Sequence, residues 1–118
     1  MAEPAHKRRR GRLDAVFGAL ADPTRRAIVE RLVEGEATVT ELAEPFDISL
    51  PAISRHLRVL AEAGLIGRRK DGRLHHCHLV EDPLRDAIGW IVHYGAFWEE
   101  RLDSLEALFP RSMQGTEP

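Results

Sequence analysis

Apolar residues recur with the period of an α-helix over most of the chain. The clearest stretch is residues 50–63, where Ile53, Leu57 and Leu60 stand at i, i+4 and i+7 and therefore share one face. Residues 84–108 show the longest such pattern. The sequence predicts five helices, which lie within residues 13–21, 23–34, 38–44, 50–63 and 84–108. It also predicts two strands, at residues 65–70 and 73–80.

Short polar residues mark where these helices begin. Asp22 is a favoured N-cap, and Pro23 after it fits the first helical position, where its missing N–H costs nothing. Thr38 or Thr40 can cap the next helix, and Thr38 with a glutamate three residues later matches the capping box. Ser49 is expected to cap the helix over 50–63.

Glycine and proline mark where the elements end. Gly64 is expected to close the helix before it, with Leu65 packing back onto that helix. Asp71-Gly72 predicts the turn of a β-hairpin. The last helix is expected to stop before Pro110, with residues 110–118 forming a polar tail.

The charge is unevenly distributed, although the formal net charge is only −2. Residues 1–12 and 49–73 each carry a net +4, whereas 13–48 and 74–118 each carry −5. A concentrated basic segment on an otherwise acidic protein is typical of a nucleic-acid contact. The alternative is a charged surface that only keeps the protein solvated. The basic residues 1–12 are interpreted as a flexible tail that either contacts DNA or aids solubility.

The order α-α-α-α-β-β-α predicts a mainly α fold with a small β-hairpin wing, the layout of a winged helix-turn-helix. Apolar residues of its two central helices are expected to face inward: Leu42, Phe46, Ile48, Ile53 and Leu57. The outer face of the helix over 50–63 is small and hydrogen-bonding at its start, which suits a major groove about 12 Å wide. The candidate DNA contacts are Ser49, Pro51, Ala52, Ser54, Arg55, His56 and Arg58 on this helix, and Arg68, Arg69, Lys70 and Arg73 on the hairpin.

Three motifs resemble those of the ArsR (SmtB/ArsR) family of bacterial transcriptional repressors. They are Ala19-Leu-Ala-Asp-Pro-Thr-Arg-Arg-Ala-Ile28, Thr38-Val-Thr-Glu-Leu-Ala43, and Leu50-Pro-Ala-Ile-Ser-Arg-His-Leu-Arg-Val-Leu60 followed by Glu62-Ala-Gly-Leu65. The resemblance covers roughly residues 13–108. It implies a homodimer that binds a palindromic operator, with the recognition helix at 49–62, the wing at 65–80, and the first and last helices in the dimer interface.

The last helix independently predicts dimerisation, because its apolar residues alternate steps of four and three. This seam comprises Leu84, Ile88, Ile91, Gly95, Trp98, Leu102, Leu105 and Phe109. The alternative is a single wide stripe that faces the protein's own core. With the first helix included, the predicted interface consists of Leu13, Phe17, Leu84, Ile88, Ile91, Trp98, Leu102 and Leu105.

The resembled family often senses metals, but its usual ligand patterns are missing here. The first helix of the helix-turn-helix has no Cys-x-Cys, and the last helix offers only His93, with acidic residues at the wrong spacings. His75-His76-Cys77-His78 is the one visible cluster, and on a strand it presents only two ligands to each face. We therefore expect no bound metal and no other cofactor, and interpret Cys77 as a buried residue.

Together these features predict a sequence-specific DNA-binding repressor that is not an enzyme, lies in the cytoplasm and does not engage a membrane; no effector is identified. The alternatives are a metal- or redox-responsive sensor that uses the wing cluster, or a winged helix that contacts another protein. In the main interpretation Arg55→Ala relaxes sequence preference, whereas Arg69→Ala weakens binding to all sequences and flattens its salt dependence.

Overall fold

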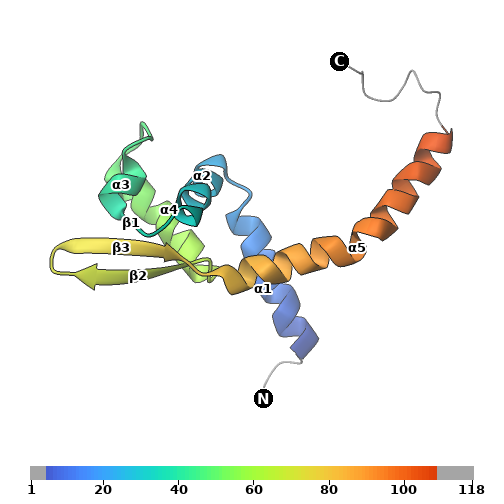
Figure 1. The fold of residues 1–118 in the computed structure, drawn as a ribbon, viewed down its shortest axis with the longest axis horizontal. Helices are drawn as coiled ribbons and strands as arrows, with labels where there is room; N and C mark the ends of the chain where they lie inside the picture. The colour runs from blue at the N-terminus through green and yellow to red at the C-terminus, as the bar shows by residue number, and fades with distance from the viewer. Residues whose placement is uncertain (1–4, 109–118) are drawn as a thin grey trace. The chain divides into compact units, whose positions relative to one another are not determined.

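A computed structural model describes residues 5–108, with side chains for residues 11–97 and 99–104. The elements are α1 (Ala5–Ala19), α2 (Pro23–Val33), β1 (Ala37–Thr38), α3 (Val39–Ala43), α4 (Leu50–Glu62), β2 (Ile66–Asp71), β3 (Leu74–Leu79) and α5 (Glu81–Leu108) (Figure 1). The predicted winged helix-turn-helix is confirmed. Helices α3 and α4 form the helix-turn-helix, and β2, β3 and the turn between them form the wing.

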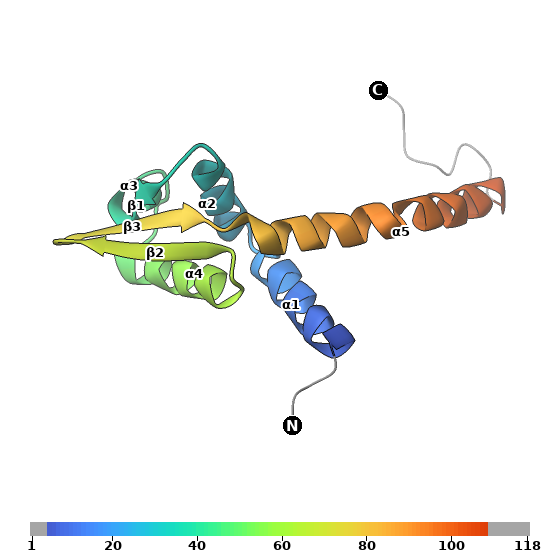
Figure 2. The same ribbon diagram turned by 60° about the horizontal axis from the view of Figure 1, so that its bottom comes forward.

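The chain divides into two units, residues 1–87 and 88–118, which we describe separately. The first unit holds the core, and α4 lies at its centre, since it contacts α1, α2, α3 and β2. In Figure 2 the helix runs alongside β2. Its predicted inner residues Ile53, Leu57 and Leu60 are fully buried. They pack with other buried residues from α1, α2, α3, the sheet and the first turns of α5: Leu13, Val16, Ala19, Ile28, Val29, Leu32, Ala37, Leu42, Leu65, Ile66, Cys77 and Ala87.

The predicted caps are present. The backbone N–H of Arg25 donates to the Asp22 carboxylate at 3.0 Å, Thr38 and Glu41 form the complete capping box, and the Ser49 hydroxyl accepts from the N–H of Ala52 at 3.3 Å. At the other end of α4, Gly64 has φ +78° and the N–H of Leu65 reaches the Leu60 carbonyl at 2.9 Å. Local sequence signals therefore fix both ends of the central helix.

The start of α1 and the turn of the hairpin differ from the sequence expectations. Helix α1 begins at Ala5, so most of the basic segment assigned to a flexible tail is helical, consistent with the good helix propensity of Lys and Arg. The hairpin pairs Asp71 with Leu74, so the two turn residues are Gly72 and Arg73 rather than Asp71-Gly72. Gly72 has φ +64°, as the first central residue of a type II′ turn requires.

A third strand was not predicted from the sequence. The two-residue β1 pairs antiparallel with β3, Ala37 opposite Cys77 and Thr38 opposite His76, so the sheet order is β1-β3-β2. The predicted tail at residues 110–118 and Phe109 lie outside the described residues. Within the described part of the chain, no helix is both long and apolar enough to cross a bilayer.

Replacing Asp22 should separate its role as a hydrogen-bonding N-cap from the effect of its negative charge. Asp22→Ala is expected to lower the free energy of unfolding by about 1 kcal/mol because it removes the N-cap of α2, whereas Asp22→Asn keeps a capping oxygen. The hydrogen bond from the Arg25 backbone lowers the pKa of Asp22, so its carboxylate favours folding at neutral pH and loses that effect as pH falls through the lowered pKa. Urea unfolding should therefore give wild type a larger free energy of unfolding than Asp22→Asn at pH 7, and the difference should narrow as acid protonates the carboxylate.

Candidate nucleic-acid interface

The face of α4 opposite its buried stripe is exposed. This face carries four exposed residues, which follow one another at steps of three and four and so share one side of the helix. They are Pro51, Arg55, Arg58 and Glu62. The positive charges lie in the first two-thirds of this face and the acidic residue at its end. A polyanion would therefore be attracted to the N-terminal part of α4.

The guanidinium groups of this face are available to an external partner. Within the described residues, neither Arg55 nor Arg58 forms an ion pair with an acidic side chain. Ala52 and Ser54 lie on the flanks of the same face and are half-buried, and Ser49 is exposed at the helix start. The structure thus brings six of the seven α4 residues predicted from the sequence to one surface.

His56 is the exception, because it turns towards the start of α2. Its Nδ1 lies 3.3 Å from Nη1 of Arg25 and 3.8 Å from the Asp22 carboxylate, and its side chain is only 22% exposed. Arg25 also donates from Nε to the carbonyl of Ala19 at 2.6 Å and from Nη2 to that of Gly18 at 3.3 Å. His56 is thus part of a contact that joins the end of α1, the start of α2 and the side of α4, which sequence reasoning missed.

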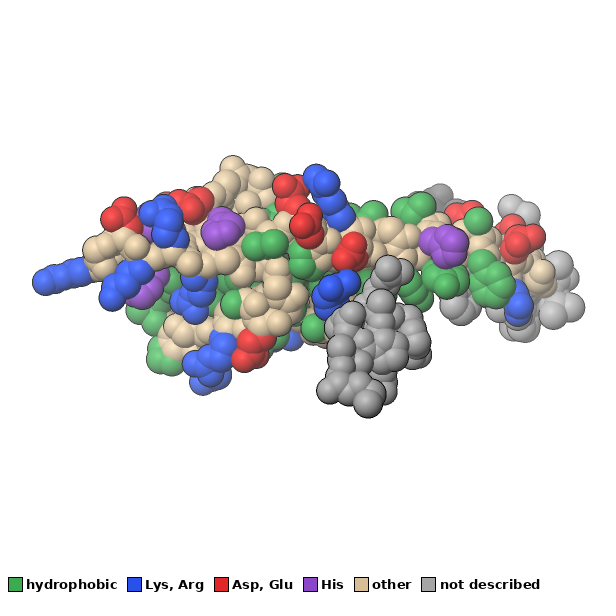
Figure 3. Space-filling view, turned by 90° about the horizontal axis from the view of Figure 1, so that it is seen from below, with side chains coloured by type: hydrophobic (Ala, Val, Ile, Leu, Met, Phe, Trp, Pro, Cys, Tyr) green, Lys and Arg blue, Asp and Glu red, His purple; other side chains and the backbone are tan. Residues whose placement is uncertain are grey.

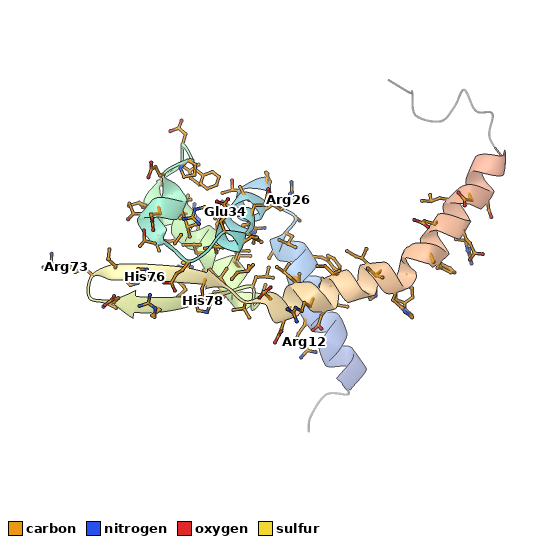
Figure 4. All side chains as sticks on the ribbon, viewed as in Figure 1. Arg12, Arg26, Glu34, Arg73, His76 and His78 are labelled. Atoms are coloured by element: carbon orange, nitrogen blue, oxygen red, sulfur yellow. The ribbon has the colours of Figure 1, made fainter. Side chains whose placement is uncertain are left out.

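The wing cations lie on two faces of the sheet. Arg68 stands opposite Cys77 in the β2–β3 ladder, and Cys77 is fully buried in the core, so Arg68 starts on the face that the helices cover. Lys70 follows on that face, because residues alternate along a strand. Arg69 lies on the opposite face. Arg73 occupies the turn and extends outward beyond the hairpin, as Figure 4 shows.

Arg69 is already held by an acidic residue. Its Nη2 donates to the Glu36 carboxylate at 2.7 Å, and its Nη1 lies 3.8 Å from Asp71. His76, the cross-strand partner of Arg69, places its Nδ1 3.6 Å from the same Glu36 oxygen. The hydrogen bond from Arg69 lowers the pKa of Glu36, so the glutamate is ionised at neutral pH. Among the predicted wing cations, Arg69 is therefore the one that forms ion pairs with acidic side chains of the described residues.

We expect Glu36→Gln to release Arg69 and strengthen binding to DNA of random sequence. At low salt the affinity should rise about two- to fivefold, and the slope of log affinity against log salt should steepen by about 0.9 for each additional phosphate contact. Fluorescence anisotropy across a salt series measures both quantities. Glu34→Gln is the matched control, since Glu34 is exposed at the end of α2 and its replacement changes the net charge equally. Equal effects of the two variants would contradict a specific role for Glu36.

Figure 3 shows Lys and Arg side chains gathered around the end of the first unit that carries the wing.

The histidines of the wing, with Cys77, are the cluster of possible metal ligands that the sequence shows. No group of three or more His, Cys, Asp or Glu side chains within the described residues is arranged to hold a metal ion. His76 and His78 lie along β3 in Figure 4, and the ring of His78 lies so close to Gly67 that a β-carbon there would collide with it.

Cys77 is fully buried, as predicted from the sequence. Burial raises the pKa of its thiol, which keeps it in the unreactive protonated form at neutral pH. The structure therefore gives Cys77 a packing role in the core, beside Ala37 of β1.

The residues predicted for a dimer interface do not share one environment. Leu13 and Leu84 belong to or pack against the core of the first unit. Phe17 of the first unit is 37% exposed. In the second unit Ile88, Ile91 and Leu102 are all more than half exposed, whereas the side chains of Trp98 and Leu105 lie outside those described. Some residues of the predicted interface therefore pack in the protein's own core, whereas others are exposed and available to a partner.

The fold and its motifs match known proteins. A family model for a helix-turn-helix domain matches residues 20–69. The transcriptional repressor SdpR of Bacillus subtilis is 38% identical over 82 residues, which cover 70% of this chain and 91% of SdpR. The HTH-type transcriptional regulator Rv2034 of Mycobacterium tuberculosis is 52% identical over 59 residues, 50% of this chain and 55% of that protein.

A crystal structure of an ArsR family transcriptional regulator is similar at a TM-score of 0.72 and 39% identity, covering 84% of this chain and 97% of the other. This regulator and SdpR are both aligned over nearly their whole length. The similarity therefore extends well beyond the helix-turn-helix segment. The chain belongs to the ArsR family of winged helix-turn-helix transcriptional regulators.

Proposed function

We propose that this chain is a transcriptional repressor that binds a palindromic operator as a homodimer, with α4 of each protomer in a major groove. The observation that carries the proposal is the outer face of α4. Its two arginines are exposed and form no ion pair among the described residues, while the opposite face is buried in the core. An exposed, cationic helix face that is not needed for folding is suited to a DNA groove.

The residues of this surface divide by role. Arg55 and Ser54 supply hydrogen-bond donors for base edges, and a bidentate arginine–guanine contact is the commonest specific one. Arg58, Arg68, Lys70 and Arg73 supply positive charge for phosphates, a sequence-independent attraction. His56 acts indirectly, since its contact with Arg25 holds α4 against the α1–α2 junction.

The homodimer is supported by the second unit. This part of α5 exposes several large apolar side chains, including Ile88, Ile91, Val92 and Leu102. A long helix with this much exposed apolar surface is typical of an interface with another protein. A second copy is the partner that fits a palindromic operator, because a two-fold dimer presents two recognition helices about 34 Å apart, one turn of DNA.

The regulator is proposed to work without a metal. The Cys-x-Cys pattern of the resembled family is missing from α3, and the described residues bring no three ligands together. His76 instead lies beside Glu36, and the ring of His78 lies beside Gly67. A repressor of this kind would respond to another signal or act without an effector.

Selection of bound sites from random DNA by the purified protein tests these statements together. The expected result is an inverted repeat whose half-site centres are about 10–10.5 base pairs apart, unchanged by added divalent metals or by oxidant. A non-palindromic site would contradict the dimer. A site whose affinity depends on a metal would contradict metal-independent regulation.

The role of Arg55 is tested on the selected operator. Arg55→Ala should lower operator affinity about 5- to 150-fold per half-site, and by the square of that factor for the dimer, because each protomer loses a base contact worth about 1–3 kcal/mol. Binding to random DNA should be nearly unchanged. Arg85→Ala is the matched control, an exposed arginine on α5 outside both α4 and the wing. If Arg55→Ala weakened operator and random DNA equally, Arg55 would be a phosphate contact instead.

A further inference from the structure

The start of α4 exposes apolar side chains that the fold does not use. Leu50, the first residue of the helix, is 56% exposed, and Ile48, two residues earlier, is 41% exposed. The sequence interpretation assigned Ile48 to the buried inner face, and the structure contradicts that. The buried stripe of α4 begins only at Ile53. Ile48 and Leu50 therefore lie beyond the core, at the N-terminal end of the helix.

Both oxygens of Ser49 accept hydrogen bonds within the protein at this point. The Ser49 hydroxyl accepts from the N–H of Ala52, and the Ser49 carbonyl accepts from the N–H of Ile53 at 3.0 Å. Pro51 has no N–H to donate. Beside the exposed Ser49, the surface that the helix start offers to a groove consists of methyl and methylene groups from Ile48, Leu50, Pro51 and Ala52.

This apolar start is continuous with the cationic face of α4. Leu50, Ser54 and Arg58 stand at i, i+4 and i+8 and therefore form one row along the side of the helix, about 12 Å long. The row presents an apolar group, then a hydroxyl, then a guanidinium. A partner with apolar and hydrogen-bonding groups beside an anionic backbone matches all three.

The major groove contains one apolar group on its base edges, the C5-methyl of thymine. Resting on the proposed function, we propose that Leu50, with Ile48 beside it, recognises a thymine methyl in each operator half-site. Leu50 is then a specificity-determining residue of a different kind from Arg55, because it reads a base through contact with a methyl group rather than through hydrogen bonds.

Deoxyuracil substitution is the test, because it removes the thymine methyl and leaves base pairing intact. Each thymine of the selected operator is replaced in turn, symmetrically in both half-sites, and affinity is measured by fluorescence anisotropy. One position should weaken wild-type binding about fourfold per half-site, roughly 15-fold for the dimer, the cost of exposing one methyl group. Leu50→Ala should bind the thymine operator more weakly by a similar factor and should show no preference for thymine over deoxyuracil at that position.

Two controls separate this effect from general damage. Val33→Ala removes an exposed apolar side chain at the end of α2, 68% exposed, and should leave the thymine preference intact. Leu50→Ala should keep the thermal unfolding midpoint of the wild type, because Leu50 is exposed and alanine is a good helix former. Ile48→Ala should reduce the preference only in part.

The outcomes distinguish this inference from the proposed function. The inference is overturned if wild type binds every deoxyuracil operator as tightly as the thymine operator, if Leu50→Ala keeps the full preference, or if the selected half-sites contain no conserved thymine. In each of these cases the protein still binds an operator and the proposed function stands. If the protein selects no operator at all, both fall.

Discussion

Leu57→Ala should destabilise the protein by about 2–5 kcal/mol, a large part of the roughly 5–15 kcal/mol typical of a folded domain. Leu57 is fully buried at the middle of α4, and α4 contacts α1, α2, α3 and β2. Removing its branched side chain leaves a cavity that these four elements cannot all close. Urea unfolding followed by far-UV circular dichroism measures the change.

Val33→Ala is the matched comparison, since it shortens an apolar side chain that solvent already reaches and should change stability by less than about 0.5 kcal/mol. Both variants must be unfolded at one protomer concentration, because association would make the midpoint depend on concentration. A loss below about 1 kcal/mol for Leu57→Ala would mean that α4 is not the centre of the core.

The elements that the sequence predicted correctly are those set by neighbouring residues. The caps at Asp22, Thr38 and Ser49 each involve a hydrogen bond to the third residue along, so the pattern and its partner lie within one helical turn. The buried stripe of α4 follows from helical periodicity in the same way. Helix positions and the inner face could therefore be predicted without any knowledge of tertiary contacts.

The elements that the sequence did not predict depend on distant residues. Strand β1 has only two residues, and its pairing with Cys77 and His76 exists because the wing folds back beside it. A segment this short carries no alternation that could mark it as a strand. The start of α1 was missed for a different reason: a run of basic residues was interpreted as a tail, although such residues also favour helix.

The same distinction between local and distant contacts explains which parts of the candidate site could be predicted from the sequence. Arg55 and Arg58 could be placed on the outer face of α4 from spacing alone. The pairing of Arg69 with Glu36, and of His56 with Arg25, could not, because about thirty residues separate the partners in each case. Strand alternation does predict that Arg69 faces away from Arg68 and Lys70, and this signal was available in the sequence.

Ile91→Asp should convert the proposed dimer into a monomer and lower operator affinity by at least about 100-fold. Ile91 is 52% exposed in the second unit, one helical turn after Ile88, which is 57% exposed. An aspartate buried between two copies would lose its hydration without gaining a partner, a cost large enough to separate them. Two linked recognition helices gain about 10²–10⁴ in effective affinity, and a monomer loses that gain.

Sedimentation velocity at micromolar protomer measures the oligomeric state, and anisotropy on the full operator and on a single half-site measures DNA binding. Ile91→Asp should bind the half-site as wild type does and should lose only the advantage of the full operator, because its α4 surface is unchanged. Ser104→Asp is the matched control: it adds the same charge to an exposed polar position of the same helix and should remain dimeric. A dimeric Ile91→Asp would place the subunit contact elsewhere, and a monomer with full operator affinity would show that DNA recognition does not require two copies.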